Sequence, residues 1–123
     1  MKMTERQKQL MTVGAAGVGA LVLARAWRAR NAYDFNGKTV VITGGSRGLG
    51  LVMARQLAAE GAKLTLIARD EADLARAADD IRTREPFAEV HTASADVRKR
   101  YEAERAIGQT LDRFGSIDVV VNN

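Results

Sequence analysis

Residues 38–50 of the chain read KTVVITGGSRGLG. The first six of them, Lys38–Thr43, form a short run rich in β-branched residues, which is typical of a buried parallel strand. Four glycines follow within seven residues, and apolar residues at helical spacing then continue through Glu60, with Gly61 as a C-terminal stop. This order predicts a strand, a tight turn and a helix in direct succession.

The rest of the chain repeats the alternation of strand and helix. Asp70 is expected to cap a helix that runs to about Arg84. Further strands are predicted at Lys63–Ala68, Glu89–Ala95 and Ile117–Val121, and a further helix from about Arg98 to Phe114. The pattern predicts an α/β fold, namely a Rossmann-like, doubly wound parallel sheet of about four strands and three helices. In such a sheet, ligands are expected at the carboxyl ends of the strands.

The glycine turn follows the pattern T-G-x-x-x-G-x-G, which suits a dinucleotide phosphate site. Gly44 would allow the tight turn, Gly48 the approach of a pyrophosphate, and Gly50 the close packing of the helix on the sheet. The helix N-terminus offers N–H groups to phosphate, and Ser46 and Arg47 add a hydroxyl and a cation. A P-loop is excluded, because no Gly-Lys-Ser/Thr follows at the required spacing.

Three further motifs stand in register with this turn. Residues 34–38 (DFNGK) precede the first strand, Asp96-Val97 follows the third, and Asn122-Asn123 follows the run DVVV at 118–121. Over residues 34–123 the chain therefore resembles the N-terminal half of the short-chain dehydrogenase/reductase family. The resemblance implies that Asp96, which Val97 follows in the motif, contacts the adenine and that Asn123 meets the cofactor ribose. The alternative for Asp96 is a cap of the third helix.

The end of the second strand indicates which nicotinamide cofactor is bound. An acidic residue there accepts from the ribose of NAD, whereas arginine suits the 2′-phosphate of NADP. This chain has Ala68-Arg69, and Arg47 is a second cation, so we predict NADP(H). Asp70 could accept from a ribose, although a helix cap is the favoured role. The expected cofactor-binding residues are Gly44, Ser46, Arg47, Gly48, Leu49, Gly50, Arg69, Asp96, Val97 and Asn123.

The catalytic residues that the resemblance implies are a serine and a Tyr-x-x-x-Lys pair, beyond the Asn-Asn-Ala-Gly motif whose first half is Asn122-Asn123. Tyr101 has Arg105 four residues on and lies before the fourth strand, so no catalytic residue is assigned. We expect the chain to be the N-terminal part of a longer NADP(H)-dependent oxidoreductase that reduces carbonyls or oxidises alcohols, inactive by itself. The alternative is a non-catalytic dinucleotide-binding or scaffolding module. Homo-oligomers are expected from the resemblance alone.

Composition excludes several classes of site and partner. The absence of cysteine excludes disulfides, thiolate nucleophiles and zinc fingers, and the single histidine, His91, cannot form a histidine metal cluster. Residues 1–30 hold six basic residues and one acidic residue, whereas residues 31–123 hold 13 basic and 14 acidic ones. The basic charge thus belongs to the N-terminal arm, and no nucleic-acid partner is predicted for the body.

The arm at residues 1–30 precedes the predicted nucleotide-binding domain at residues 31–123. Residues 10–24 (LMTVGAAGVGALVLA) carry no charge and would span roughly 23 Å as a helix, against about 30 Å for a hydrocarbon core. Residues 10–27 are a candidate membrane anchor, spanning or interfacial, and would favour a lipophilic substrate. A secretory signal with an Ala24-Arg25-Ala26 site and a soluble arm are the alternatives. Since NADPH is a cytoplasmic cofactor, we expect membrane association with the enzyme domain facing the cytoplasm, or else a cytoplasmic protein.

Overall fold

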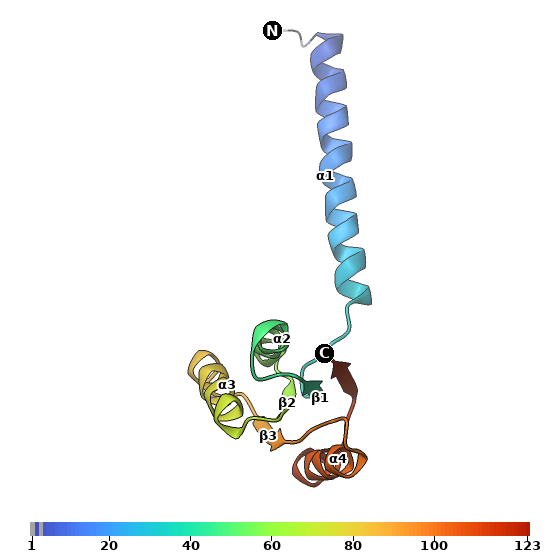
Figure 1. Ribbon diagram of the computed structural model, residues 1–123. Coiled ribbons are helices and arrows are strands. Elements are labelled where there is room, and N and C mark those ends of the chain that lie inside the picture. Colours follow the sequence, from blue (N-terminus) through green and yellow to red (C-terminus); the bar gives the residue numbers. More distant parts are fainter. Residues whose placement is uncertain (1, 3) are drawn as a thin grey trace. The chain divides into compact units, whose positions relative to one another are not determined.

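The computed structural model describes residue 2 and residues 4–123 (Figure 1). The chain divides into two compact units, residues 1–33 and residues 34–123. The first consists of one long helix, and the second contains the sheet and the other helices.

Helix α1 (Glu5–Asn31) begins with a capping box. The Thr4 hydroxyl accepts from the backbone N–H of Gln7, and the Gln7 side chain accepts from the backbone N–H of Thr4. Arg28 and Arg30 lie in the last turn, where cations stabilise the C-terminal end of the helix dipole. No residue of α1 is buried within the chain, and the helix is long and apolar enough to cross a membrane.

The second unit is built on four parallel strands in the order β3-β2-β1-β4. The strands are β1 (Thr39–Thr43), β2 (Lys63–Ala68), β3 (Val90–Ser94) and β4 (Val119–Asn122). The helices that connect them are α2 (Gly48–Ala59), α3 (Glu71–Arg84) and α4 (Arg100–Phe114). Helices α2 and α3 cover one face of the sheet and α4 covers the other (Figure 1). The predicted doubly wound α/β fold, preceded by an apolar helix, is confirmed.

The side chains of successive strand residues pack into two separate hydrophobic cores, one on each face of the sheet. Val40 and Ile42 of β1 pack beneath α2 and α3, whereas Val41 between them packs beneath α4. All three are fully buried. Because both faces of the sheet are covered at β1, residues 40–42 of that strand form a continuous apolar run rather than an alternation of apolar and polar residues.

The element boundaries agree with those predicted from the sequence to within one residue, except near two aspartates. The fourth strand begins at Val119, two residues later than predicted, because Asp118 turns its carboxylate onto the backbone N–H of Thr39 at 2.8 Å. The predicted helix from Arg98 begins at Arg100 instead. Arg98 is outside the helix because its backbone N–H donates to the Asp96 carboxylate in a turn.

Candidate cofactor site

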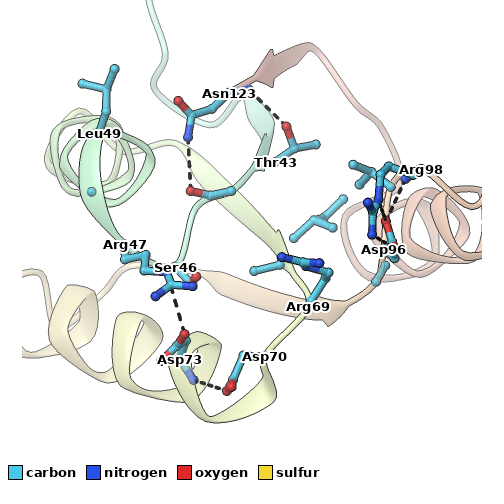
Figure 2. Close-up of a pocket in the computed structure, with 16 residues that line it drawn as sticks. Thr43, Ser46, Arg47, Leu49, Arg69, Asp70, Asp73, Asp96, Arg98 and Asn123 are labelled. Atoms are coloured by element: carbon cyan, nitrogen blue, oxygen red, sulfur yellow. Dashed lines mark hydrogen bonds and ion pairs between the residues drawn. The ribbon is translucent and has the colours of Figure 1, made fainter.

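A pocket of about 980 Å³ opens at the carboxyl ends of the strands (Figure 2). Nine of the ten residues predicted to bind a cofactor line it, and the tenth, Gly50, lies behind the turn in the first turn of α2. The remaining lining residues are Thr43, Ile67, Ala68, Asp70, Asp73, Ala95 and Arg98. The structure thus brings residues separated by up to 80 positions to one edge of the sheet.

The glycine turn connects β1 to α2 across the floor of this pocket. Gly44 and Gly48 have φ angles of +66° and +58°, in the left-handed region that favours glycine. Arg47 is the N-cap residue of α2 and makes no side-chain capping bond. The first N–H groups of α2 therefore lack a side-chain cap, and a helix N-terminus in that condition is suited to bind phosphate oxygens.

The end of β4 is attached to the glycine turn through its asparagines. Asn123 donates from Nδ2 to the carbonyl oxygen of Gly44 at 3.3 Å, and from its backbone N–H to the Thr43 hydroxyl at 3.1 Å (Figure 2). The Thr43 hydroxyl donates to the Asn122 side chain at 3.0 Å. Asn122 therefore links β4 to β1, whereas Asn123 also reaches the pocket.

Two arginines and two aspartates line the side of the pocket next to the start of α3. Arg47 has its guanidinium Nε 3.9 Å from the Asp73 carboxylate (Figure 2). The same carboxylate also pairs with Arg76. The Arg47 side chain is 82% exposed, so this ion pair contributes little to stability and leaves the guanidinium able to turn.

Asp70 and Arg69 precede α3 on the same side. The Asp70 carboxylate accepts from the backbone N–H of Asp73 at 3.0 Å, and this bond lowers the pKa of Asp70 below its usual value of 3.8. Asp70 thus serves as the helix cap that the sequence favoured. Arg69 lines the pocket, and its backbone carbonyl accepts from the Ser94 hydroxyl at 2.8 Å, which fixes the turn after β2 onto β3.

The turn after β3 forms the opposite side of the pocket. Asp96 accepts from the backbone and the guanidinium of Arg98, and these bonds lower the pKa of the Asp96 carboxyl from 3.8 to about 2. Val97 presents an exposed apolar side chain beside it. Arg98 and Asp73 also line the pocket, although neither was predicted to do so from the sequence. For Arg98 a local signal exists, because it lies two residues after Asp96 at the end of a strand, a spacing that could have indicated the pairing of these two side chains.

The described residues offer no further chemistry of the kinds considered from the sequence. Among them, no group of three or more histidine, cysteine, aspartate or glutamate residues could hold a metal ion. Tyr101 is an exposed residue in the first turn of α4, and Arg105 donates to the backbone carbonyl of Ser94 instead of pairing with it. The pair therefore does not resemble a catalytic tyrosine with its base.

Comparison with known proteins identifies the family. Residues 38–123 match the sequence model of a protein family, and the description of that family is short chain dehydrogenase. The chain belongs to the short chain dehydrogenase family. The resemblance inferred from the motifs is therefore confirmed.

Members of the short chain dehydrogenase family with known names or structures match about three quarters of this chain. A 1,6-dihydroxycyclohexa-2,4-diene-1-carboxylate dehydrogenase from Pseudomonas putida is 39% identical over 89 residues, which are 72% of this chain and 32% of that protein. The structure of L-sorbose reductase from Gluconobacter frateurii, complexed with NADPH and L-sorbose, has a TM-score of 0.69 at 33% identity, over 74% of this chain and 35% of that one.

A third relative holds the other nucleotide. A short chain dehydrogenase/reductase from Burkholderia phymatum, solved in complex with NAD, has a TM-score of 0.68 at 34% identity, over 72% of this chain and 31% of that one. The solved relatives thus include one in complex with NADPH and one in complex with NAD. The chain spans about a third of the length of the curated relatives that it matches.

Proposed function

We propose that this chain is the nucleotide-binding part of an NADP(H)-dependent oxidoreductase that reduces carbonyls or oxidises alcohols. The observation that carries the proposal is the glycine turn, whose left-handed Gly44 and Gly48 lead into a helix without a side-chain cap. The pyrophosphate would lie against the N–H groups of α2, where the helix dipole favours negative charge. Gly48 leaves room for its approach, since a Cβ atom there would meet nothing within 4 Å.

The preference for NADP(H) rests on the charges around the expected ribose position. Arg47 and Arg69 both line the pocket, and neither is held in a tight ion pair among the described residues. Asp70, the acid that could accept from an unphosphorylated ribose, instead caps α3. Two guanidinium groups can form charge-assisted hydrogen bonds with the 2′-phosphate of NADP. The ribose of NAD carries an uncharged hydroxyl at this position and cannot form such bonds.

The remaining roles complete the binding site for the dinucleotide. Ser46 would add a hydroxyl to the phosphate site and Leu49 an apolar wall beside it, since both line the pocket. Asp96 and Val97 would contact the adenine, and Asn123 the ribose. When bound, the nicotinamide supplies or accepts the hydride, and these residues bind and orient it.

Charge reversal at Arg69 tests the cofactor assignment. A hydrogen bond to a charged group contributes about 1.5–3 kcal/mol, so Arg69→Glu should weaken NADPH binding by roughly 10- to 100-fold. NADH binding should change by less than about threefold, because NADH has no 2′-phosphate for the guanidinium to bind. Arg100→Glu is the matched control, since Arg100 is an exposed residue of α4 outside the pocket lining. Equal losses for both nucleotides in Arg69→Glu would contradict the assignment.

We further propose that α1 anchors the protein in a membrane by spanning it, with the nucleotide-binding unit on the cytoplasmic side. At about 100° per residue, Leu10, Val22 and Leu23 point in three directions roughly 120° apart. All three are exposed, as are Met11, Val13, Val18, Leu21 and Trp27. A helix that is apolar on every side suits a bilayer interior, whereas an interfacial helix needs a polar face. Such an anchor would favour lipophilic substrates.

A further inference from the structure

The turn after β3 is organised around a two-pronged contact between neighbouring side chains. Arg98 donates from Nε to Oδ1 of Asp96 at 3.0 Å and from Nη2 to Oδ2 at 2.9 Å (Figure 2). The backbone N–H of Arg98 also donates to Oδ1, at 3.1 Å. From the other side, Glu102 of α4 accepts from the backbone N–H of Asp96 at 2.6 Å. Both the backbone and the carboxylate of Asp96 are therefore fixed in place.

These bonds leave one of the two carboxylate oxygens able to accept another hydrogen bond. An ionised carboxylate offers about four acceptor sites, two on each oxygen. Oδ1 already accepts two donors, both from Arg98, whereas Oδ2 accepts only one. The Asp96 side chain is 16% exposed and lines the pocket, so a ligand in the pocket can approach its carboxylate.

The adenine ring carries a donor that fits this remaining site. Its exocyclic amino group has two N–H bonds, and a carboxylate held in one orientation can accept one of them. We infer that Arg98 is a positioning residue for adenine recognition, which holds the Asp96 carboxylate so that Oδ2 accepts from the amino group. The inference rests on the proposed function, because it assumes that a nicotinamide adenine dinucleotide occupies the pocket.

The charge of Arg98 supports the same role. The guanidinium bonds to the ionised form of Asp96 and lowers the pKa of that carboxyl to about 2, and at physiological pH the carboxylate acts only as an acceptor. A lysine at this position would supply the charge without the rigid fork of donors that fixes the carboxylate plane. Charge and geometry can therefore be separated by substitution.

The experiment compares NADPH with its hypoxanthine analogue, in which a carbonyl oxygen replaces the amino group. Dissociation constants for both are measured by fluorescence titration on the full chain and on Arg98→Ala, Arg98→Lys and Arg100→Ala. The unchanged chain should bind NADPH roughly tenfold more tightly than the analogue, because the carbonyl oxygen would face the carboxylate without a hydrogen bond. Arg98→Ala should reduce this preference to about threefold or less.

The two other variants act as controls. Arg98→Lys should also lose most of the preference, while its affinity for the analogue stays within about threefold of the unchanged chain. Arg100→Ala removes a neighbouring positive charge that pairs with Glu104 outside the pocket lining, and it should keep the full preference.

Two results would overturn the inference while leaving the proposed function intact. One is an unchanged preference for adenine in Arg98→Ala, and the other is an equal loss of affinity for both nucleotides, which a merely structural role would produce. If the unchanged chain binds neither nucleotide in a saturable manner, the proposed function fails and the inference fails with it.

Discussion

Gly50 packs so closely on Gly44 that a Cβ atom on Gly50 would overlap the carbonyl oxygen of Gly44 and lie 2.9 Å from Nδ2 of Asn123. The first turn of α2, the glycine turn and the end of β4 thus meet at one point, and only a residue without a side chain fits there. The phosphate site that we propose depends on this contact, because it sets where the N–H groups of α2 lie relative to the sheet.

Gly50→Ala should therefore destabilise the protein and impair nucleotide binding. Overpacking of a tight contact costs about 1–3 kcal/mol of unfolding free energy, which urea denaturation can measure. Gly108→Ala is the control, because a Cβ atom at Gly108, within α4, meets nothing within 4 Å. That variant should gain about 0.5–1 kcal/mol from better helix propensity. If Gly50→Ala were as stable as Gly108→Ala, the described packing would be wrong.

A buried pair of hydroxyls joins α4 to the centre of the sheet. The hydroxyls of Thr65 and Thr110 lie 3.0 Å apart, both residues are fully buried, and Thr110 also donates to the carbonyl oxygen of Ala106. Thr110→Val should lower the unfolding free energy by about 1–3 kcal/mol, because the Thr65 hydroxyl loses its partner. Replacing both threonines by valine should cost less than the sum of the two single changes. Strict additivity in a double-mutant cycle would contradict the pairing.

The contribution of the Asp96 carboxylate to the stability of the folded protein should depend on pH in the acidic range. Its pKa is about 2 in the folded protein against a usual value of 3.8, because Arg98 bonds to the ionised form. A lowered pKa stabilises the folded state above about pH 3.8 and loses this contribution as the pH falls towards 2. The difference in stability between the unchanged chain and Asp96→Asn, from urea denaturation at several pH values, should therefore shrink over that range. A difference that stays constant from pH 7 to pH 2 would speak against the ion pair.

The membrane proposal predicts that one charge in the middle of α1 weakens retention. Val18→Lys places an ammonium group near the centre of the apolar stretch, which costs about 2.5–3.5 kcal/mol for insertion. The variant should appear in the soluble fraction after an alkaline wash of the membranes, whereas the unchanged chain should sediment with them. Gln9→Lys adds the same charge at the edge of the stretch and should remain with the membranes. Retention of Val18→Lys equal to that of the control would contradict a spanning α1.

Much of the fold could be predicted because its signals are local. The strand at Lys63–Ala68 and the helix that follows it have the predicted bounds, with Asp70 as the cap. An apolar run and a capping residue act over a few positions, so the sequence shows them directly. The start of β4 could not be placed in this way, because it depends on the contact of Asp118 with Thr39 across 79 positions.

The candidate site was predictable in its residue types but not in its detailed contacts. The glycine turn and the arginines were visible as motifs, and the structure gathers them at one edge of the sheet. The ion pair of Arg47 with Asp73 depends on how α3 lies beside the turn, and the fork of Arg98 on Asp96 requires α4 to begin two residues later than predicted. The first contact follows from tertiary packing, which no single segment encodes, whereas the second joins residues only two positions apart within one turn.

We propose that a nicotinamide adenine dinucleotide binds at the carboxyl edge of the sheet. The measurement that tests this binding follows the backbone amide chemical shifts of the isotope-labelled full chain in detergent micelles during titration with NADPH. We predict saturable shifts clustered at residues 44–50, Arg69, residues 96–98 and Asn123, with little change at Ala88 on the opposite edge. The absence of saturable shifts, or their clustering away from the glycine turn, would contradict the account.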